Sequence, residues 1–450
     1  MASGAVAGQA LAAEPNPGLR HNRSWHRLWL AQAVSLTGDS VFDITIMLWV
    51  ATVLAKDQPW APAAASGVLI AATVPVLVVG PLAGVWVDRW DRRRIMLTAD
   101  ACRAVLIASL LVVPALGHRL PLAAELGTVY AVVAAESAFA QFFNPSRLAV
   151  LGLIVAPVDR PQASGMLQAT SGTASIVGPP LAAPLLFALG VQWALVVDAL
   201  SFVISFAAIR SLRPPPAAGQ PSPRSGFRAE FRAGVRFFVT SRVLVALSAG
   251  VVICTLGTGA LNALEVFFLR DNLHNSPGWL GTLYAAIGAG AVGGALAGGW
   301  AGRRIGPARV FWIAMVLGGV LLLAYSRLTR FPAALAVGSL VGLMFGALNA
   351  AAPPLFLAAI PQPLMGRVMS VFNPLQQVAN IISIAVAGLL AGTVLRGMHL
   401  VVAGVTFGPV DTIFAASAVL IIIGGLVMIR PLSGQCAARP SGPRGAPVGP

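Results

Sequence analysis

The chain has 450 residues, of which 57% are hydrophobic and only 10% are charged, and its mean hydropathy is +0.82. Soluble globular proteins carry about 25% charged residues, so this composition excludes a soluble protein and predicts an integral membrane protein. The formal net charge of +15 does not indicate nucleic-acid binding, because the arginines lie in short segments between apolar runs rather than on a polar domain.

Twelve apolar runs are each long enough to cross a bilayer as a helix of about 20 residues. They predict an all-α membrane protein with twelve transmembrane helices. The predicted spans are 28–54, 64–87, 95–116, 122–144, 163–188, 191–209, 243–269, 279–301, 308–326, 332–352, 366–391 and 401–429. An even number of spans places both termini on the same side of the membrane.

The distribution of basic residues predicts the orientation. If the N-terminus is cytoplasmic, the inner segments hold 23 of the 30 Lys and Arg residues and the outer segments hold six. Cytoplasmic loops carry such an excess, so both termini are expected in the cytoplasm. The predicted organisation is a disordered tail at 1–24, a six-helix bundle at 25–210, a cytoplasmic linker at 211–241, a second six-helix bundle at 242–430 and a disordered tail at 431–450.

The linker between the two bundles begins with the stiff segment Arg213-Pro214-Pro215-Pro216. Further along, Phe227, Phe231, Val235 and Phe238 share one helical face beside three arginines. This pattern predicts an amphipathic helix on the anionic inner leaflet.

One turn occurs twice in the chain. Gly84, Trp86 and Arg89 recur 214 residues later as Gly298, Trp300 and Arg303. The same offset carries residue 28, at the start of the first span, to residue 242, at the start of the seventh. The sequence therefore predicts two parallel six-helix repeats.

These features resemble the major facilitator superfamily of transporters. Its signature turn, Gly-x-x-x-Asp-Arg-x-Gly-Arg-Arg, is matched here by Gly84, Asp88, Arg89, Arg92 and Arg93, while Asp91 replaces the second glycine. The turn, the segment 144–147 and the segment 193–202 look like the bacterial branch that contains enterobactin and macrolide exporters. The resemblance covers residues 25–430, and it implies a multi-pass protein of the bacterial inner (plasma) membrane.

The resemblance implies that this turn is a cytoplasmic gate that holds the two halves together. Asp88 can face the positive N-terminus of a helix, and the arginines can bind nearby carboxylates. Asp100 and Arg103, three residues apart near the inner end of the third span, are expected to complete the charge network. The alternative is that the turn only anchors the topology, with its arginines in water.

Three acids lie deep in the predicted spans. Asp39 and Asp43 share one face of the first helix, and Glu136 lies at a similar depth in the fourth. A charged acid near the bilayer midplane costs about 2.5–3.5 kcal/mol on insertion scales, and such acids often carry protons. We expect Asp39 and Glu136 to couple transport to protons; the alternative is structural hydrogen bonding between helices.

The resemblance implies that spans 1, 4, 7 and 10 line a central cavity. The polar residues expected near the substrate are Asp43, Asn262, Glu265, Asn349, Asn373 and Gln376. Those in the eleventh span form a stripe that fits either a cavity wall or contacts between helices. In the fifth span, Gly178-Pro179 resembles the antiporter signature Gly-x-x-x-Gly-Pro-x-x-Gly-Gly, with alanines at three of its glycines, and predicts a kink.

We expect neither a metal nor a cofactor, because the three cysteines lie far apart and the sequence has no nucleotide-binding loop. The predicted function is proton-coupled export of a small lipophilic or amphipathic molecule by a monomer in the lipid bilayer. Uptake or facilitated diffusion on the same scaffold is the alternative. A membrane-embedded enzyme or receptor is less favoured, because the spans contain no nucleophile-base pair and the tails are too short to form a domain.

Overall fold

The computed structural model describes residues 18–87, 90–116, 119–212, 235–361, 364–395, 398, 400–402 and 405–433. Within these ranges, twelve helices are long and apolar enough to cross a membrane, as predicted. The predicted tails lie mostly outside the described residues. The same holds for the predicted amphipathic helix of the linker, of which only the helical residues 235–240 are described.

The first half contains six of the twelve spans. Its elements are α1 (Gly18–His21), α2 (Arg23–Trp49) with η1 (Val50–Leu54), α3 (Ala61–Val78), α4 (Gly80–Val87), α5 (Arg92–Ser109), α6 (Val112–Leu116), α7 (Leu122–Ile154), η3 (Pro157–Asp159), α8 (Arg160–Pro184) with η4 (Leu185–Leu189), and α9 (Val191–Ser211). Helix α2 begins after Asn22, whose side chain accepts a hydrogen bond from the backbone N–H of Trp25 and so caps the helix.

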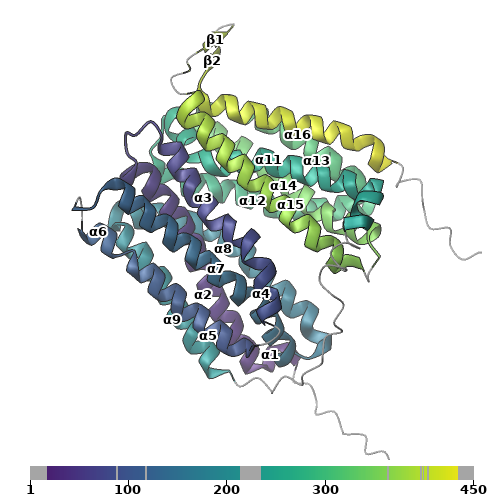
Figure 1. The fold of residues 1–450 in the computed structure, drawn as a ribbon. Coiled ribbons are helices and arrows are strands. Elements are labelled where there is room, and N and C mark those ends of the chain that lie inside the picture. The colour runs from purple at the N-terminus through teal and green to yellow at the C-terminus, as the bar shows by residue number, and fades with distance from the viewer. Residues whose placement is uncertain are drawn as a thin grey trace, which may run out of the picture.

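The second half contains the other six spans. Its elements are α11 (Arg242–Asp271), η5 (Pro277–Trp279), α12 (Leu280–Ile305), α13 (Pro307–Tyr325), α14 (Phe331–Ala359), α15 (Met365–Leu389) with η7 (Leu390–Val394), β1 (Leu400–Val402), β2 (Val405–Phe407) and α16 (Pro409–Ser433). Figure 1 shows the two halves as separate helix bundles, with the short hairpin projecting at one end.

The hairpin corrects the predicted start of the last span. We expected a helix from residue 401, but β1 and β2 pair antiparallel there and α16 begins at Pro409. Val401, Val402 and Val405 are β-branched, which favours strands. Proline suits the first turn of a helix, where its missing N–H costs nothing. The apolar residues 401–402 and 405–407 thus belong to a hairpin and not to the membrane helix.

The two halves repeat one packing scheme. In the first half α2 packs against α8 and α9, α5 against α7 and α9, and α3 against α7. In the second half α11 packs against α15 and α16, α13 against α14 and α16, and α12 against α14. Each helix thus has the same neighbours as its counterpart, as two parallel repeats require.

The outer surface of the molecule is apolar. Val105 is 69% exposed, Leu296 is 73% exposed and Val427 is 59% exposed. Large aliphatic side chains exposed along long helices suit contact with lipid tails, which carry no penalty for apolar surface. This surface agrees with the twelve spans in identifying a multi-pass membrane protein.

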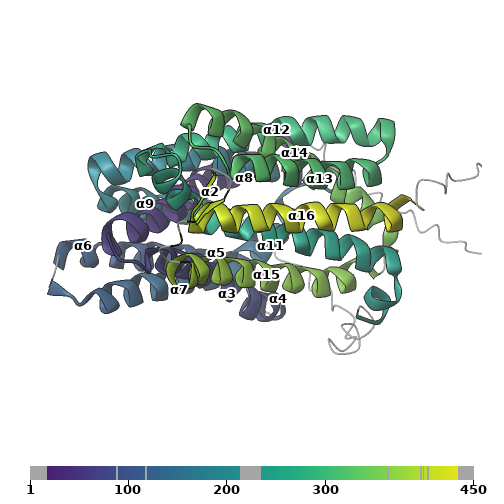
Figure 2. The ribbon, with the colours of Figure 1, turned by 90° about the horizontal axis from the view of Figure 1, so that it is seen from above.

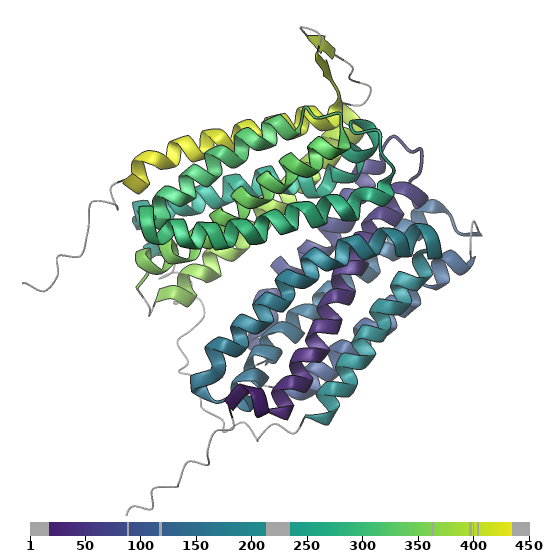
Figure 3. The same ribbon diagram turned by 180° about the vertical axis from the view of Figure 1, so that it is seen from behind.

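The halves touch mainly through two pairs of helices on opposite flanks. Helix α15 runs along α3, and α12 runs along α8 (Figure 2). Gly388 of α15 lies against Ser66 of α3, and Gly281 of α12 lies against the backbone of Pro179 and Pro180. These contacts gather at one end of the molecule, and the bundles diverge toward the end where α1 lies (Figure 3).

Glycines bring α12 and α14 into backbone contact. A Cβ added at Gly294 would meet the carbonyl oxygen of Leu343, and one at Gly346 would meet the carbonyl oxygen of Ala291. Small residues permit such close approach of membrane helices, where van der Waals packing drives association. These two helices form the tightest seam of the second half, which we call the glycine seam.

We predict that Gly294→Ala destabilises the protein, because the added methyl collides with backbone that cannot rotate away. Overpacking of this kind costs about 1–3 kcal/mol, which exceeds the roughly 1 kcal/mol that alanine gains over glycine in helix propensity. Thermal unfolding of the purified protein in detergent measures the difference.

Gly293→Ala is the matched control, because nothing lies within 4 Å of a Cβ added there. It is expected to leave the unfolding temperature unchanged or raised. Equal unfolding temperatures for the two variants would contradict the glycine seam.

Candidate functional site

Arg103 lies at the centre of the polar interior of the first half. It follows the start of α5 by 11 residues, which is roughly 16 Å along the helix, and it is only 5% exposed. Its Nη2 donates to Asp39 Oδ1 at 3.2 Å, and its Nε donates to Glu136 Oε1 at 2.6 Å. A second hydrogen bond runs from Nη2 to the same Glu136 oxygen. One guanidinium therefore ties α2, α5 and α7 together.

This position differs from the one expected for Arg103. We expected Arg103 and Asp100 in the cytoplasmic gate network, but the structure places Arg103 between the two acids predicted for proton coupling. The physical reason is desolvation, since a guanidinium deep in an apolar helix needs charged partners and finds them on the adjacent helices. Asp100 is also buried, and its neighbour is Ser205 of α9.

More polar groups surround this centre. Asp198 of α9 is 1% exposed and accepts a hydrogen bond from Ser201 at 3.3 Å. Gly38 of α2 gives both of them room, because a Cβ there would lie 2.7 Å from each. The ring of Phe202 lies 4.0 Å from the Arg103 guanidinium carbon, within the range of a cation–π contact.

A cavity of ≈ 560 Å³ lies between the halves. Seven helices contribute to its wall: α2, α3, α7, α8, α11, α12 and α15. Asp43 and Asn262 line it, as expected of residues near a substrate, and so do Tyr284 and Asn380. Helix α14 contributes nothing to this wall, contrary to the expectation for the tenth span, because its glycines are packed against α12.

The remaining predicted cavity residues lie elsewhere. Glu265 is 1% exposed and accepts a hydrogen bond from the hydroxyl of Tyr325 on α13, inside the second half. Asn349 and Asn373 are exposed and Gln376 is half-buried, and the structure brings none of the three to this cavity. The spacing of amide residues in a sequence predicts which of them share a helical face, but what that face contacts depends on tertiary packing.

The basic turn after α4 is only partly described. Gly84 lies in α4, whereas Asp88 and Arg89 lie outside the described residues. Arg93 donates to the carbonyl oxygens of Ile209 at 3.2 Å and Arg210 at 2.5 Å, and Arg92 is half-buried beside it. These bonds satisfy carbonyl groups at the C-terminal end of α9, within the first half.

Asp91, which replaces a glycine of the signature, has a local role that the sequence analysis missed. Its side chain accepts a hydrogen bond from the backbone N–H of Arg94 at 2.9 Å and caps α5. An aspartate directly before a helix is a recognisable capping signal.

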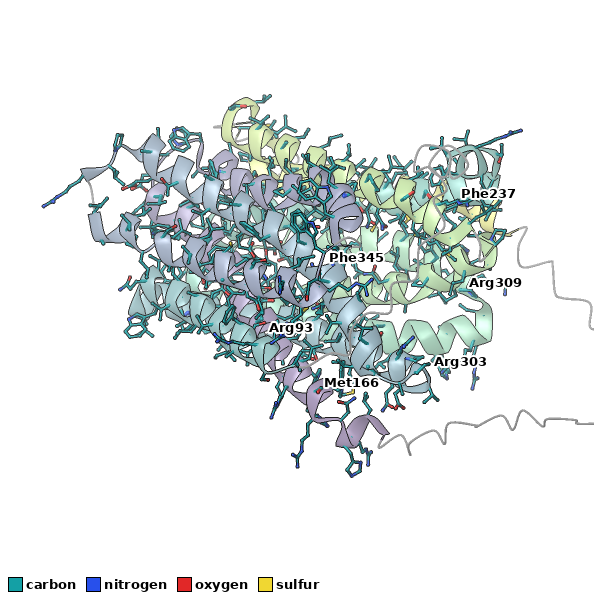
Figure 4. All side chains as sticks on the ribbon, turned by 60° about the horizontal axis from the view of Figure 1, so that its bottom comes forward. Arg93, Met166, Phe237, Arg303, Arg309 and Phe345 are labelled. Atoms are coloured by element: carbon teal, nitrogen blue, oxygen red, sulfur yellow. The ribbon has the colours of Figure 1, made fainter. Side chains whose placement is uncertain are left out.

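On the second half, Arg303 and Arg309 lie at the same end as Phe237 (Figure 4).

The predicted kink segment of α8 is a contact between three helices. A Cβ at Gly178 would collide with the side chain of Ser40, so α8 lies close against α2 at this point. One residue further, the carbonyl of Pro179 lies against Gly281 of α12 in the other half. Helix α8 continues through these residues to Pro184 and then passes into the π-helical turn η4.

Comparisons with known proteins agree on the family. The sequence profile of the Major Facilitator Superfamily matches residues 28–383. The chain is 27% identical over 384 residues to the multidrug efflux pump Tap of Mycolicibacterium fortuitum, covering 82% of this chain and 87% of that protein. It is 25% identical over 373 residues to macrolide efflux protein A of Streptococcus pyogenes, covering 82% and 89%.

Solved structures agree on the fold. A crystal structure of a mutant of the nucleoside transporter NupG superposes with a TM-score of 0.68 at 13% identity, covering 91% of this chain and 99% of that chain. At this identity the likeness concerns the architecture alone.

We predict that Arg103→Met lowers the unfolding temperature strongly, because it leaves Asp39 and Glu136 buried without a counter-charge. Breaking a buried ion pair from one side costs about 3–5 kcal/mol. The triple variant Arg103→Met, Asp39→Asn, Glu136→Gln removes the charges together and is expected to recover most of the loss. Arg119→Met, at an exposed arginine, is the control. A triple variant no more stable than the single one would contradict the shared pairing.

Proposed function

The chain belongs to the major facilitator superfamily, and on that premise we propose that it exports a small lipophilic or amphipathic molecule in exchange for protons. Export is supported by likeness to proteins named as efflux pumps from two bacterial genera, each matched over most of its length. The observation that carries the proton coupling is the sharing of one buried guanidinium by two carboxylates from different helices, beside the cavity between the halves.

The proposed setting is a bacterial inner membrane with both termini in the cytoplasm. Arg303, Arg309 and the start of α5 belong to the basic segments that are retained on the cytoplasmic side in such proteins. The halves diverge toward this end and touch at the other (Figure 3). In this orientation the structure corresponds to an inward-open state, in which a molecule from the cytoplasm or the inner leaflet can enter.

Asp39 and Glu136 are the proposed proton-coupling residues. When both are ionised, Arg103 holds α2 and α7 against α5; when a proton neutralises one acid, that helix is released while Arg103 keeps its other partner. The shared arrangement thus lets a proton bind without leaving a buried charge unpaired.

The packing offers a route from these acids to the interface between the halves. Helix α2 packs on α8, which contacts α12 of the second half, and α7 packs on α3, which contacts α15. The two acids are therefore on the helices that support both contacts between the halves. A change in their pairing shifts the balance between inward-open and outward-open states, as alternating access requires.

The other proposed roles follow from position. The basic turn with Gly84, Asp88, Arg89, Arg92 and Arg93 is the proposed cytoplasmic gate, to which Arg93 contributes by fixing the end of α9. Asp43 and Asn262 are the proposed substrate contacts. Gly178 and Pro179 form the proposed pivot, since α8 meets α2 and α12 there.

The function is tested in a bacterial host that lacks its main efflux pumps. Cells expressing the protein are expected to accumulate less of at least one fluorescent lipophilic dye from a panel of neutral and charged dyes, and a protonophore should abolish the difference. Asp39→Asn should abolish it too, because the residue can no longer take up a proton. Asp57→Asn, at an exposed acid, is the control. Higher accumulation on expression would indicate uptake, and an effect that survives both the protonophore and Asp39→Asn would refute proton coupling.

We predict that a disulfide between Ala63→Cys and Gly392→Cys stops transport. A Cβ at position 392 lies 3.6 Å from that of Ala63, which is within the usual disulfide range of about 3.5–4.5 Å. The crosslink joins α3 to η7 across the two halves and holds the outer end closed.

The assay uses a background in which the three native cysteines are alanine. Oxidation should abolish efflux, a reductant should restore it, and each single cysteine variant should be insensitive. Full efflux by completely crosslinked protein would contradict an alternating-access cycle that opens this end.

A further inference from the structure

One acidic side chain lines the central cavity, and no basic side chain is found among the described residues of its wall. Of the described residues that line it, Asp43 is the only Asp, Glu, Lys or Arg. Histidine is also missing from this lining. The cavity is therefore an apolar space with one acid and a few neutral polar groups, among them Asn262 and Asn380.

Asp43 differs from the other deep acids of α2 and α7 in making no direct ion pair. Asp39 and Glu136 both bond to Arg103, whereas Asp43 lies one turn from Asp39 and makes no hydrogen bond or ion pair with any described residue. Its side chain is exposed to the cavity. Arg103 attracts Asp43 only through space, because its hydrogen bonds go to Asp39 and Glu136.

We propose that the substrate is an organic cation and that Asp43 is its counter-charge. This inference rests on the proposed transport function and adds the chemical class of the substrate. A carboxylate facing an apolar cavity is poorly solvated, so a bound cation supplies the partner that the protein does not. Four acids beside the cavity, Asp39, Asp43, Glu136 and Asp198, outnumber the two arginines Arg103 and Arg147 that act on them. This excess of acids favours cations over anions.

The rest of the wall suits the body of such a cation. Phe42 and Tyr284 supply aromatic rings, Met47, Leu69 and Ile287 supply aliphatic surface, and Asn262 and Asn380 approach from the second half. Aromatic rings attract cations through their faces. A cavity of ≈ 560 Å³ is within the range of about 300–1,000 Å³ usual for drug-sized ligands. An amphipathic cation thus fits in charge, polarity and size.

The test compares two probes of nearly identical shape and opposite charge, tetraphenylphosphonium and tetraphenylborate. Equilibrium dialysis measures their binding to the purified full-length protein in detergent at one fixed pH. The wild type is expected to bind tetraphenylphosphonium at least tenfold more tightly than tetraphenylborate. Asp43→Asn should weaken tetraphenylphosphonium binding at least tenfold without weakening that of tetraphenylborate, and Asp43→Glu should keep the preference.

Asp57→Asn removes one acid outside the cavity and is expected to bind both probes as the wild type does. Any of three results would overturn the proposal: no binding of tetraphenylphosphonium, equal or tighter binding of tetraphenylborate by the wild type, or unchanged tetraphenylphosphonium binding by Asp43→Asn. Because the assay involves neither a proton gradient nor a direction, failure of proton-coupled export would leave its outcome unaffected.

Discussion

The low polarity of the membrane interior is the constraint that organises the first half. A charge buried between the helices, away from the cavity, needs a partner inside the protein, since lipid cannot stabilise it. Arg103 meets this requirement by bonding to Asp39 and Glu136, which fixes three helices around one point. Other side chains pack around this point: the ring of Phe202 covers the Arg103 guanidinium, and Asp198 and Ser201 pack against Gly38. A few polar residues thus determine how most of the bundle is arranged.

The second half uses the same scaffold with a different interior. Positions 214 residues after Asp39 and Arg103 are Ile253 and Leu317, and α14, the counterpart of α7, contains no charged residue. Its helices are held by the glycine seam and by aromatic packing around Phe268. The Arg103 cluster of the first repeat and the glycine seam of the second accompany the same helix arrangement, so the duplication preserved the contact pattern and not these particular contacts.

Most of the fold could be predicted from the sequence. Twelve spans, two repeats and the family follow from hydropathy and one repeated turn, because hydrocarbon imposes length and composition on every span. The acids deep in the spans could also be recognised from the sequence, because a charge in the membrane interior is costly. Asp43 and Asn262 line the cavity, as expected. The partners were not predictable. Arg103 was assigned by its spacing from Asp100, but its contacts come from helices 64 and 33 residues away. Glu265 was assigned to the cavity, yet its side chain meets Tyr325 instead. Helical periodicity defines a face, and tertiary packing decides what it touches.

The glycine seam has a consequence for how the two bundles differ as mechanical bodies. Contacts between side chains can yield by changing rotamers, but contacts between backbones cannot. With Gly294 against Leu343 and Gly346 against Ala291, α12 and α14 are joined along much of their length. The α12–α14 pair is thus a rigid unit within the second bundle, whereas Arg103 joins α2, α5 and α7 of the first bundle through a long side chain that can rotate.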